Sequence, residues 1–223
     1  MTGSRGDQKA RTSQAEKAAA TRRRIGAAAL ELFVERGYAA TSIDSIAKRA
    51  GVAVQTVYYF YGNKIAILKG LLDVSVAGDD APIPTLDRPW VAEAVAADPT
   101  EQLRIQVSAA RQISERAAAV LQTLRGAATA DAEAAELWAA NRAQLRTVQQ
   151  HLVTALADKN ALRDELDIET ATDIAYAIIG ADVYQILVHE RGWSPMQWEQ
   201  WTVQLLQQQL LPAGFGGPVQ HHL

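Results

Sequence analysis

The side chains best suited to chemistry lie in one short stretch, GVAVQTVYYFYGNK, at positions 51–64. Gln55 carries an amide that can form two hydrogen bonds with adenine, and Thr56 can offer a hydroxyl or a methyl group to a base edge. The hydroxyls of Tyr58 and Tyr59 can reach phosphate groups. These residue types favour recognition of a nucleic acid over catalysis.

Motifs of catalytic or metal chemistry are absent from the sequence. It has no Cys, so disulfides and thiolate metal sites are excluded. His151 and His189 are isolated and lack metal-ligand spacing, and the pair His221–His222 is near the chain end. No nucleophile elbow, phosphate loop or supported pair of carboxylates occurs. We therefore expect a protein that is not an enzyme and that needs no metal or other cofactor.

The composition suits a folded protein of the cytoplasm. The chain has 223 residues, of which 48% are hydrophobic, enough to bury a core. The absence of Cys fits a reducing compartment. No uninterrupted apolar run reaches the roughly 18 residues of a membrane span, and the N-terminus lacks the apolar part of a signal peptide. We expect a soluble, cytoplasmic protein with no membrane partner.

Charge is distributed unevenly along the chain. Residues 1–72 contain 12 Lys and Arg against 5 Asp and Glu, whereas residues 73–223 contain 10 against 20. An asymmetry of this kind suggests a part that faces nucleic acid, joined to a part with another task.

The basic part reads as short helices. Residues 1–20 are polar and small and predict a disordered basic arm. Between Thr21 and Gly37 apolar residues recur at helical spacing, and Gly37 supplies a stop. A short helix at 42–49, a turn, and a second helix at 53–61 follow, before another helix opens near Lys64.

The acidic part reads as longer helices after a proline-containing linker at 78–89. Capping signals and apolar periodicity mark each of them, and no segment is a convincing strand. The sequence therefore predicts an all-α fold, with a three-helix helix-turn-helix domain at 21–72 and a helical domain at 73–223. The expected long helices are 98–126, 131–158, 167–191 and 194–211.

The layout of residues 42–61 is that of a helix-turn-helix. Ala47 is small enough for the second helix to approach closely, and Gly51 can take the positive φ angle of the turn. Val57 and Tyr61, four residues apart, point to the core, so Gln55 and Tyr59 turn outward. The second helix of such a unit lies in the major groove of DNA.

Residues 21–72 resemble the DNA-binding domain of TetR/AcrR-family transcriptional regulators. The matching motifs are F-x-x-x-G-Y, the T-S-I-x-x-I-A run, the A-G-V turn, T-V-Y-Y and the Lys that opens the fourth helix. They stand in this order and at the family's spacing, at Phe33–Tyr38, Thr41–Ala47, Ala50–Val52, Thr56–Tyr59 and Lys64.

The sequence departs from the family pattern in and after the second helix. Ala53 stands where the family usually has a Ser or Thr cap, and Val54 stands where some members present a polar base reader. Phe60, Tyr61 and Gly62 replace the common His, Phe and Pro. Loss of a cap typically costs about 1 kcal/mol. The residues expected to contact DNA are Arg24, Thr41, Ser42, Val54, Gln55, Thr56, Tyr58, Tyr59 and Lys64.

The resemblance implies that the acidic domain binds a small molecule and forms a homodimer through its last two long helices. Apolar residues nearly all round the segment 168–191 independently indicate burial on more than one side. The dimer-interface candidates are Ile178, Ile179, Ala181, Trp198, Trp201 and Leu205. The ligand-binding candidates, polar or aromatic residues beside apolar helical faces, are Arg111, Gln112, Trp138, His151 and Tyr176.

The function expected from these observations is sequence-specific regulation of transcription. The chain would bind a palindromic double-stranded operator as a homodimer and would be released from it by an unidentified small-molecule effector. The alternative is a constitutive DNA-binding regulator without a small-molecule switch.

Overall fold

The computed structural model describes residues 4–79, 81 and 83–213, with side chains from residue 14 onward. Over these residues the chain is helical and contains no strand, which confirms the predicted all-α class. By their internal contacts the helices form two compact units. The first contains the chain up to Asp73 together with Ala119–Leu137, and the second contains Val74–Ala118 and the chain from Trp138 onward.

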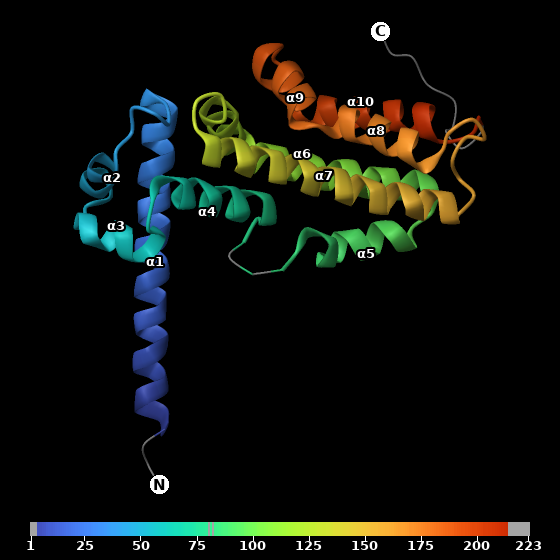
Figure 1. The fold of residues 1–223 in the computed structure, drawn as a ribbon. Helices are drawn as coiled ribbons and strands as arrows, with labels where there is room; N and C mark the ends of the chain where they lie inside the picture. The colour runs from blue at the N-terminus through green and yellow to red at the C-terminus, as the bar shows by residue number, and fades with distance from the viewer. Residues whose placement is uncertain (1–3, 80, 82, 214–223) are drawn as a thin grey trace. The chain divides into compact units, whose positions relative to one another are not determined.

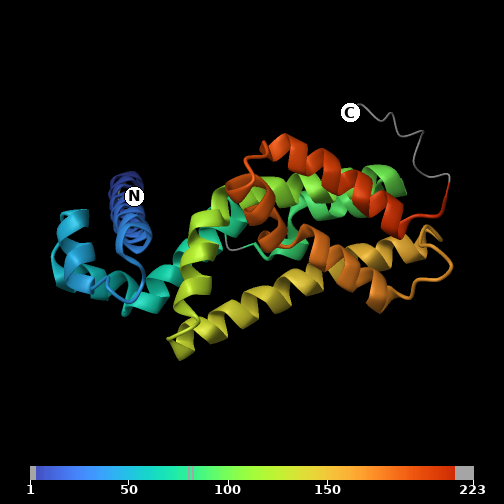
Figure 2. The same cartoon turned by 90° about the horizontal axis from the view of Figure 1, so that it is seen from above.

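The first unit contains the helix-turn-helix. Its elements are α1 (Ser4–Arg36), α2 (Ile43–Ala50), α3 (Val54–Tyr61), most of α4 (Lys64–Ala77), and the adjoining ends of α6 (Pro99–Ala127) and α7 (Ala132–Asp158). Helices α2 and α3 lie on the same side of α1 in both views (Figures 1 and 2).

The core of this unit follows the predicted helical periodicity. The apolar stripe of α1 is buried and packs with the inner faces of α2, α3 and α4. The buried residues of this core are Ile25, Ala28, Ala29, Leu32 and Phe33 from α1, Ile46 and Ala47 from α2, Val57 from α3, and Ile67, Leu68 and Leu72 from α4.

The start of α1 differs from the sequence-based expectation. The helix begins at Ser4, so residues 4–20 continue it in place of the expected disordered arm. Residues 14–20 contain Ala, Gln, Glu and Lys, which have high helix propensity and extend a helix already held by the buried stripe.

The second unit is a layered helical bundle. It contains the one-turn helix η1 (Thr85–Asp87), α5 (Pro89–Ala96), most of α6 and α7, α8 (Ile168–Ile179), α9 (Ala181–Tyr184), the π-helical turn η2 (Gln185–Glu190) and α10 (Pro195–Leu210). Helices α6 and α7 form the middle layer, α8, α9 and α10 cover one side, and α5 covers the other (Figure 1). The main core gathers Leu103, Val107, Val153, Leu156, Ala175, Tyr184, Trp198 and Leu206.

Two features of this unit were not predicted. Helix α5 begins at Pro89, the last residue of the expected linker, and fills the stretch before the first expected long helix. The expected helix 167–191 is interrupted at Gly180, whose ψ of 146° leaves the helical region. A Cβ at Gly180 would lie 3.1 Å from the carbonyl oxygen of Tyr176, so glycine permits this break.

The segment Ile168–Glu190 is also long and apolar enough to cross a membrane by length and composition. It spans 23 residues with a mean hydropathy of 1.3. This result qualifies the expectation that no such segment exists. The expectation rested on the lack of an uninterrupted apolar run, whereas the mean hydropathy stays high even though a few polar residues interrupt this segment. Its buried residues Ala171, Ala175 and Ile179 belong to the core of the second unit, although only 28% of the apolar window is buried.

Candidate nucleic-acid interface

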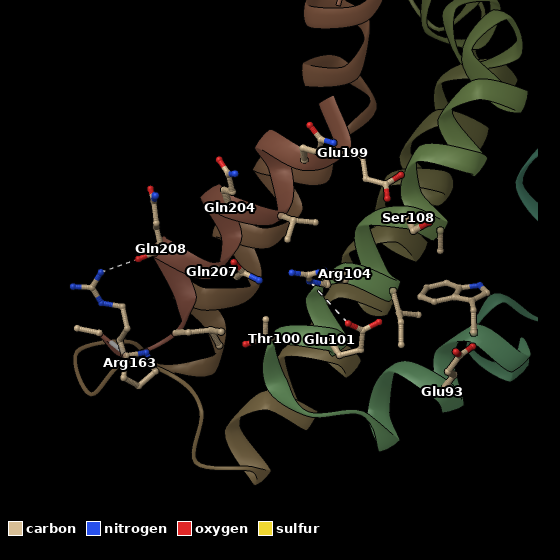
Figure 3. Close-up of a pocket in the computed structure, with 18 of the residues that line it drawn as sticks. Glu93, Thr100, Glu101, Arg104, Ser108, Arg163, Glu199, Gln204, Gln207 and Gln208 are labelled. Atoms are coloured by element: carbon tan, nitrogen blue, oxygen red, sulfur yellow. Dashed lines mark hydrogen bonds and ion pairs between the residues drawn. The ribbon is translucent and has the colours of Figure 1, made fainter. Parts of the chain in front are cut away.

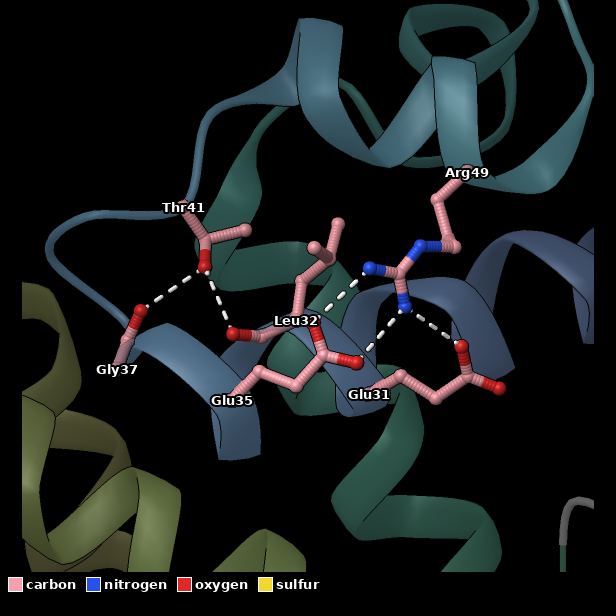
Figure 4. Close-up of polar contacts among 6 residues, drawn as sticks. All are labelled: Glu31, Leu32, Glu35, Gly37, Thr41 and Arg49. Atoms are coloured by element: carbon pink, nitrogen blue, oxygen red, sulfur yellow. Dashed lines mark hydrogen bonds and ion pairs between the residues drawn. The ribbon is translucent and has the colours of Figure 1, made fainter.

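The loop before α2 is anchored to α1 by a buried threonine. Thr41 is only 2% exposed. Its hydroxyl lies 2.9 Å from the carbonyl oxygen of Gly37 and 3.2 Å from that of Leu32 (Figure 4). A buried hydroxyl that serves the backbone is unavailable to a DNA strand. The expected DNA contact by the Thr41 side chain is thus corrected to a structural role.

Ser42 caps α2. Its hydroxyl accepts a hydrogen bond from the Ser45 N–H at 3.2 Å, while the Ser45 hydroxyl accepts one from the Ser42 N–H at 3.2 Å. This reciprocal pair satisfies backbone donors that the helix start would leave without partners. Ser42 remains exposed, so a backbone phosphate could approach the same end of α2.

The turn between α2 and α3 depends on a left-handed glycine. Gly51 has a φ of 63°, and the following Val52 N–H donates to the Ala47 carbonyl at 3.0 Å. Together these features end α2 and start the chain toward α3. Ala53 then occupies the N-cap position of α3 with extended backbone (φ −69°, ψ 148°), and no side chain caps the helix. The recognition helix therefore starts without the side-chain cap usual at this position.

Helix α3 separates its aromatic residues by helical phase. Val57 is fully buried, whereas Tyr59 and Tyr58 are 84% and 53% exposed. Gln55 is also exposed, and Val54 and Thr56 are half-buried. Large exposed aromatic side chains beside an exposed amide are unusual on a solvated surface and suit a surface that contacts a ligand.

The other two rings hold α3 to α1. The Tyr61 hydroxyl donates to the Arg22 carbonyl at 3.1 Å. The Arg22 guanidinium lies 5.8 Å from the centre of the Phe60 ring and 5.9 Å from that of Tyr61. Arg24 of α1 is exposed and carries a charge available to phosphate.

Lys64 forms hydrogen bonds within the protein that the sequence did not predict. Its ammonium group donates to the carbonyls of Tyr38 at 2.7 Å and Thr41 at 3.0 Å, and it lies 4.1 Å from the centre of the Tyr38 ring. Burial lowers the pKa of Lys64. The amine therefore fixes the loop between α1 and α2. A DNA phosphate that contacted Lys64 would share the ammonium group with these two carbonyls.

An ion-pair clamp between α1 and α2 was missed from the sequence. Arg49 donates to Glu31 at 3.0 Å and to both carboxylate oxygens of Glu35 at 3.0 and 2.9 Å (Figure 4). The hydrogen bond from Arg49 lowers the pKa of Glu35. Glu31 and Glu35 are one turn apart on α1, which was the available signal, but only the folded chain shows that Arg49 reaches both.

The described part of the second unit contains a groove of ≈ 1450 Å³ (Figure 3). Among the five ligand candidates only Gln112 lines it. Arg111 instead pairs with Glu199 and Glu115. Tyr176 lies away from the groove, where its hydroxyl accepts a hydrogen bond from Arg142 at 2.6 Å. Half-buried Trp138 and exposed His151 are also outside the lining, so the structure does not bring these candidates together.

The dimer candidates divide between surface and core. Ile178, Ala181, Trp201 and Leu205 are half-buried. Ile179 and Trp198 are 3% and 0% exposed. The ring of Trp198 packs edge-on to Tyr184 with centres 5.1 Å apart, so it fills the protomer's own core. The interface role expected for these two buried residues is corrected to core packing.

The segment Ile168–Glu190 also carries exposed apolar side chains. Ile168 and Ile186 are 38% and 48% exposed, although both are large aliphatic residues.

Within the described residues, no group of three or more His, Asp and Glu side chains is placed to hold a metal ion.

Known bacterial transcriptional regulators are similar to this chain in sequence. The family model described as bacterial regulatory proteins, tetR family, matches residues 25–71. The uncharacterized HTH-type transcriptional regulator YdeS of Bacillus subtilis (strain 168) is 31% identical over 169 residues, which cover 75% of this chain and 79% of YdeS.

Solved structures extend the likeness to both units. NalD, the secondary repressor of the MexAB-OprM multidrug efflux pump in Pseudomonas aeruginosa, aligns with a TM-score of 0.71 and 22% identity over 89% of this chain and 99% of NalD. A SmeT–triclosan complex aligns with a TM-score of 0.70 and 18% identity over 89% of this chain and 95% of that chain. SmeT is the repressor of the Stenotrophomonas maltophilia multidrug efflux pump SmeDEF. At these identities the structural likeness concerns the fold.

Proposed function

Since this chain belongs to the TetR family of DNA-binding transcriptional regulators, we propose that it is a homodimeric repressor released from its operator by a small molecule. The observation that supports this most directly is the outward face of α3, where Gln55, Tyr58 and Tyr59 are exposed beside the fully buried Val57. A regulator of this kind works in the cytoplasm, where the bacterial chromosome is accessible.

The proposed DNA contacts come from the exposed face of α3 and its surroundings. Gln55 reads a base edge in the major groove, with Thr56 and Val54 beside it. Tyr58 and Tyr59 contact phosphate or pack on the backbone sugar, and Arg24 and Ser42 add phosphate contacts. Two copies of α3 in a dimer would occupy successive major grooves of a palindrome.

The proposed dimer uses the apolar groups exposed from Ile168 to the end of α10. Ile186 and Ile168 are large exposed aliphatic residues, and Trp201 stacks edge-on to Trp193 with centres 5.9 Å apart. A partner helix that covered such a surface would remove apolar area from water. Ile178, Ala181 and Leu205 are half-buried and complete the proposed surface.

Ligand control is supported by the groove and by the relatives. The groove offers space for a small organic molecule, and SmeT, itself a repressor, was solved with triclosan bound. A ligand that binds better to a conformation with altered helix spacing would lower operator affinity by linkage. Among the candidates from the sequence, Gln112 keeps a place in this proposal.

The DNA assignment is tested on a DNA sequence selected from a random pool by the purified protein. Substitution Gln55→Ala should weaken operator binding about 10- to 100-fold, equivalent to about 1–3 kcal/mol for a lost bidentate base contact. Tyr59→Ala should weaken it as well, while the control Gln150→Ala, on an exposed position of α7, should not. Unchanged affinity for both α3 variants would exclude α3 as the recognition helix.

The dimer is tested separately by light scattering on the full chain. Ile186→Glu should produce a monomer with weaker operator binding, because it places a charge in the proposed interface. The control Ile83→Glu changes an equally exposed isoleucine, 44% accessible, outside that surface.

The alternative function, a constitutive regulator without a small-molecule switch, predicts that operator affinity stays the same in the presence of every compound screened.

A further inference from the structure

We propose that the groove of the second unit binds an amphipathic organic cation, with the cationic end between Trp90 and Glu93. This inference rests on the proposed function, because it names the chemical class of the effector. The groove is formed by α5, α6, α10 and the loop before α8. Figure 3 shows Glu93 and Glu101 on the α5–α6 side, facing the glutamines of α10.

The arginines of the groove already have carboxylate partners. Arg163 donates to Glu165 at 2.8 Å and to the carbonyl oxygen of Gln208 at 3.1 Å, so its guanidinium is held by the groove's own backbone and loop. Arg104 lies 3.9 Å from Glu101, a loose pair on the surface of α6. An anionic ligand would have to displace these carboxylates, which disfavours an anion.

The groove has negative charge left over. The inner wall carboxylate, Glu199, is 18% exposed and is neutralised by Arg111 behind it. Glu93 and Asp164 also line the groove. Both are exposed, and among the described residues neither carboxylate is paired with an arginine or lysine. The lining therefore offers two carboxylates in excess of its paired arginines, and a cation beside Glu93 would gain from that charge.

An aromatic ring stands beside one of these carboxylates. Trp90 and Glu93 both line the groove from α5 and are three residues apart, so they share one face of that helix. An indole ring next to a carboxylate attracts a cation by the ring quadrupole and by direct charge. A quaternary ammonium group suits this pair because it needs no hydrogen-bond acceptor.

The remaining lining suits an apolar tail attached to the cation. Ile105 and Ala109 of α6, together with Val203 of α10 and Leu211 after it, contribute aliphatic surface. Apart from Glu199 and Val203, the α10 residues of the groove are neutral amides, which can line a ligand without fixing a charge. These are Gln200, Gln204, Gln207 and Gln208.

The test measures binding of three eight-carbon probes to the full-length protein by calorimetry. Octyltrimethylammonium should bind at least about 10-fold more tightly than octanoate or 1-octanol at matched ionic strength. Glu93→Gln and Trp90→Leu should each weaken the cation about 3- to 30-fold, as expected for a lost charge or cation–π contact. Glu169→Gln, an exposed carboxylate of α8 outside the groove, should leave the affinity unchanged.

The outcomes separate this proposal from the repressor proposal. Equal binding of the three probes, or cation binding that neither groove variant weakens, would overturn the cation site. Release of the operator by a neutral or anionic compound instead would leave the repressor proposal standing without the cation. Cation binding with the expected variant effects but no change in operator affinity would keep the site and contradict its effector role.

Discussion

The missing cap of the recognition helix permits a gain of stability by one substitution. Ala53 already has the extended backbone of an N-cap residue, and no side chain caps α3. A serine there could accept a hydrogen bond from the first turn without moving the chain. We expect Ala53→Ser to stabilise the protein.

The magnitude follows from the hydrogen bonds already present. Cap residues contribute roughly 0.5–2 kcal/mol relative to alanine. The Thr56 N–H already donates to the Ala53 carbonyl at 2.9 Å, so part of the first turn is satisfied. We therefore expect a gain of about 0.5–1 kcal/mol, which corresponds to a rise in Tm of about 1–4 °C for a chain of this size.

The assay combines thermal unfolding by circular dichroism with operator binding. The control Ala27→Ser places the same residue at an exposed position inside α1, where serine has no capping role. Ala53→Asp adds a negative charge at the helix start, which the helix dipole favours. Near DNA the same charge repels phosphate, so Ala53→Asp should stabilise the fold yet weaken operator binding, most strongly at low salt.

Two results would refute this reasoning. If Ala53→Ser melts no higher than the unsubstituted protein, a serine at this position does not cap the first turn of α3. If Ala53→Asp binds the operator as tightly as Ala53→Ser, the start of α3 does not face the DNA.

Substitutions at three further positions test the packing that positions α3. Gly51→Ala should cost about 1–2 kcal/mol, because alanine resists the φ of 63°, although a Cβ there meets nothing within 4 Å. Gly51→Asn, which tolerates this conformation, should recover part of that loss in the same urea-unfolding assay. Thr41→Val keeps the shape but removes the buried hydroxyl that donates to the carbonyls of Gly37 and Leu32, so it should cost about 1–2 kcal/mol. Thr41→Ser should be milder, and neither should change operator affinity per folded molecule. Because Arg49 lowers the pKa of Glu35 below the ordinary 4.5, the pair stabilises the fold above that pH and the stabilisation is lost as pH falls through the lowered value. Acid unfolding of Glu35→Gln followed by circular dichroism should therefore depend less steeply on pH below about 4.5, and an unchanged profile would contradict a role for this pair.

Local pattern accounts for the parts of the fold that were predicted. The buried stripe of α1 follows from helical periodicity, and the left-handed turn at Gly51 follows from the conformation that glycine can adopt. Helical phase likewise places Val57 inside and Tyr59 outside. These features depend on neighbours within a few residues, so the sequence contains their cause.

Features that depend on distant partners were not predicted. A lysine at the start of α4 reads as a free charge, yet Lys64 finds two carbonyls in the loop before α2. An aromatic stripe on the last helix reads as an interface, yet Trp198 fills a space beside Tyr184. Long side chains reach many neighbours, and their partner is chosen by how the helices pack.

The sequence by itself determined that the chain is helical, that it carries a helix-turn-helix, and which face of the second helix carries Gln55 and Tyr59. Spacing and residue type suffice for these because a helix repeats every 3.6 residues whatever lies around it. Only the tertiary structure decided that Thr41 and Lys64 serve the loop and that Arg49 joins two helices. The same holds for the groove beside Glu93, since each of these results from side chains far apart in the chain meeting in space.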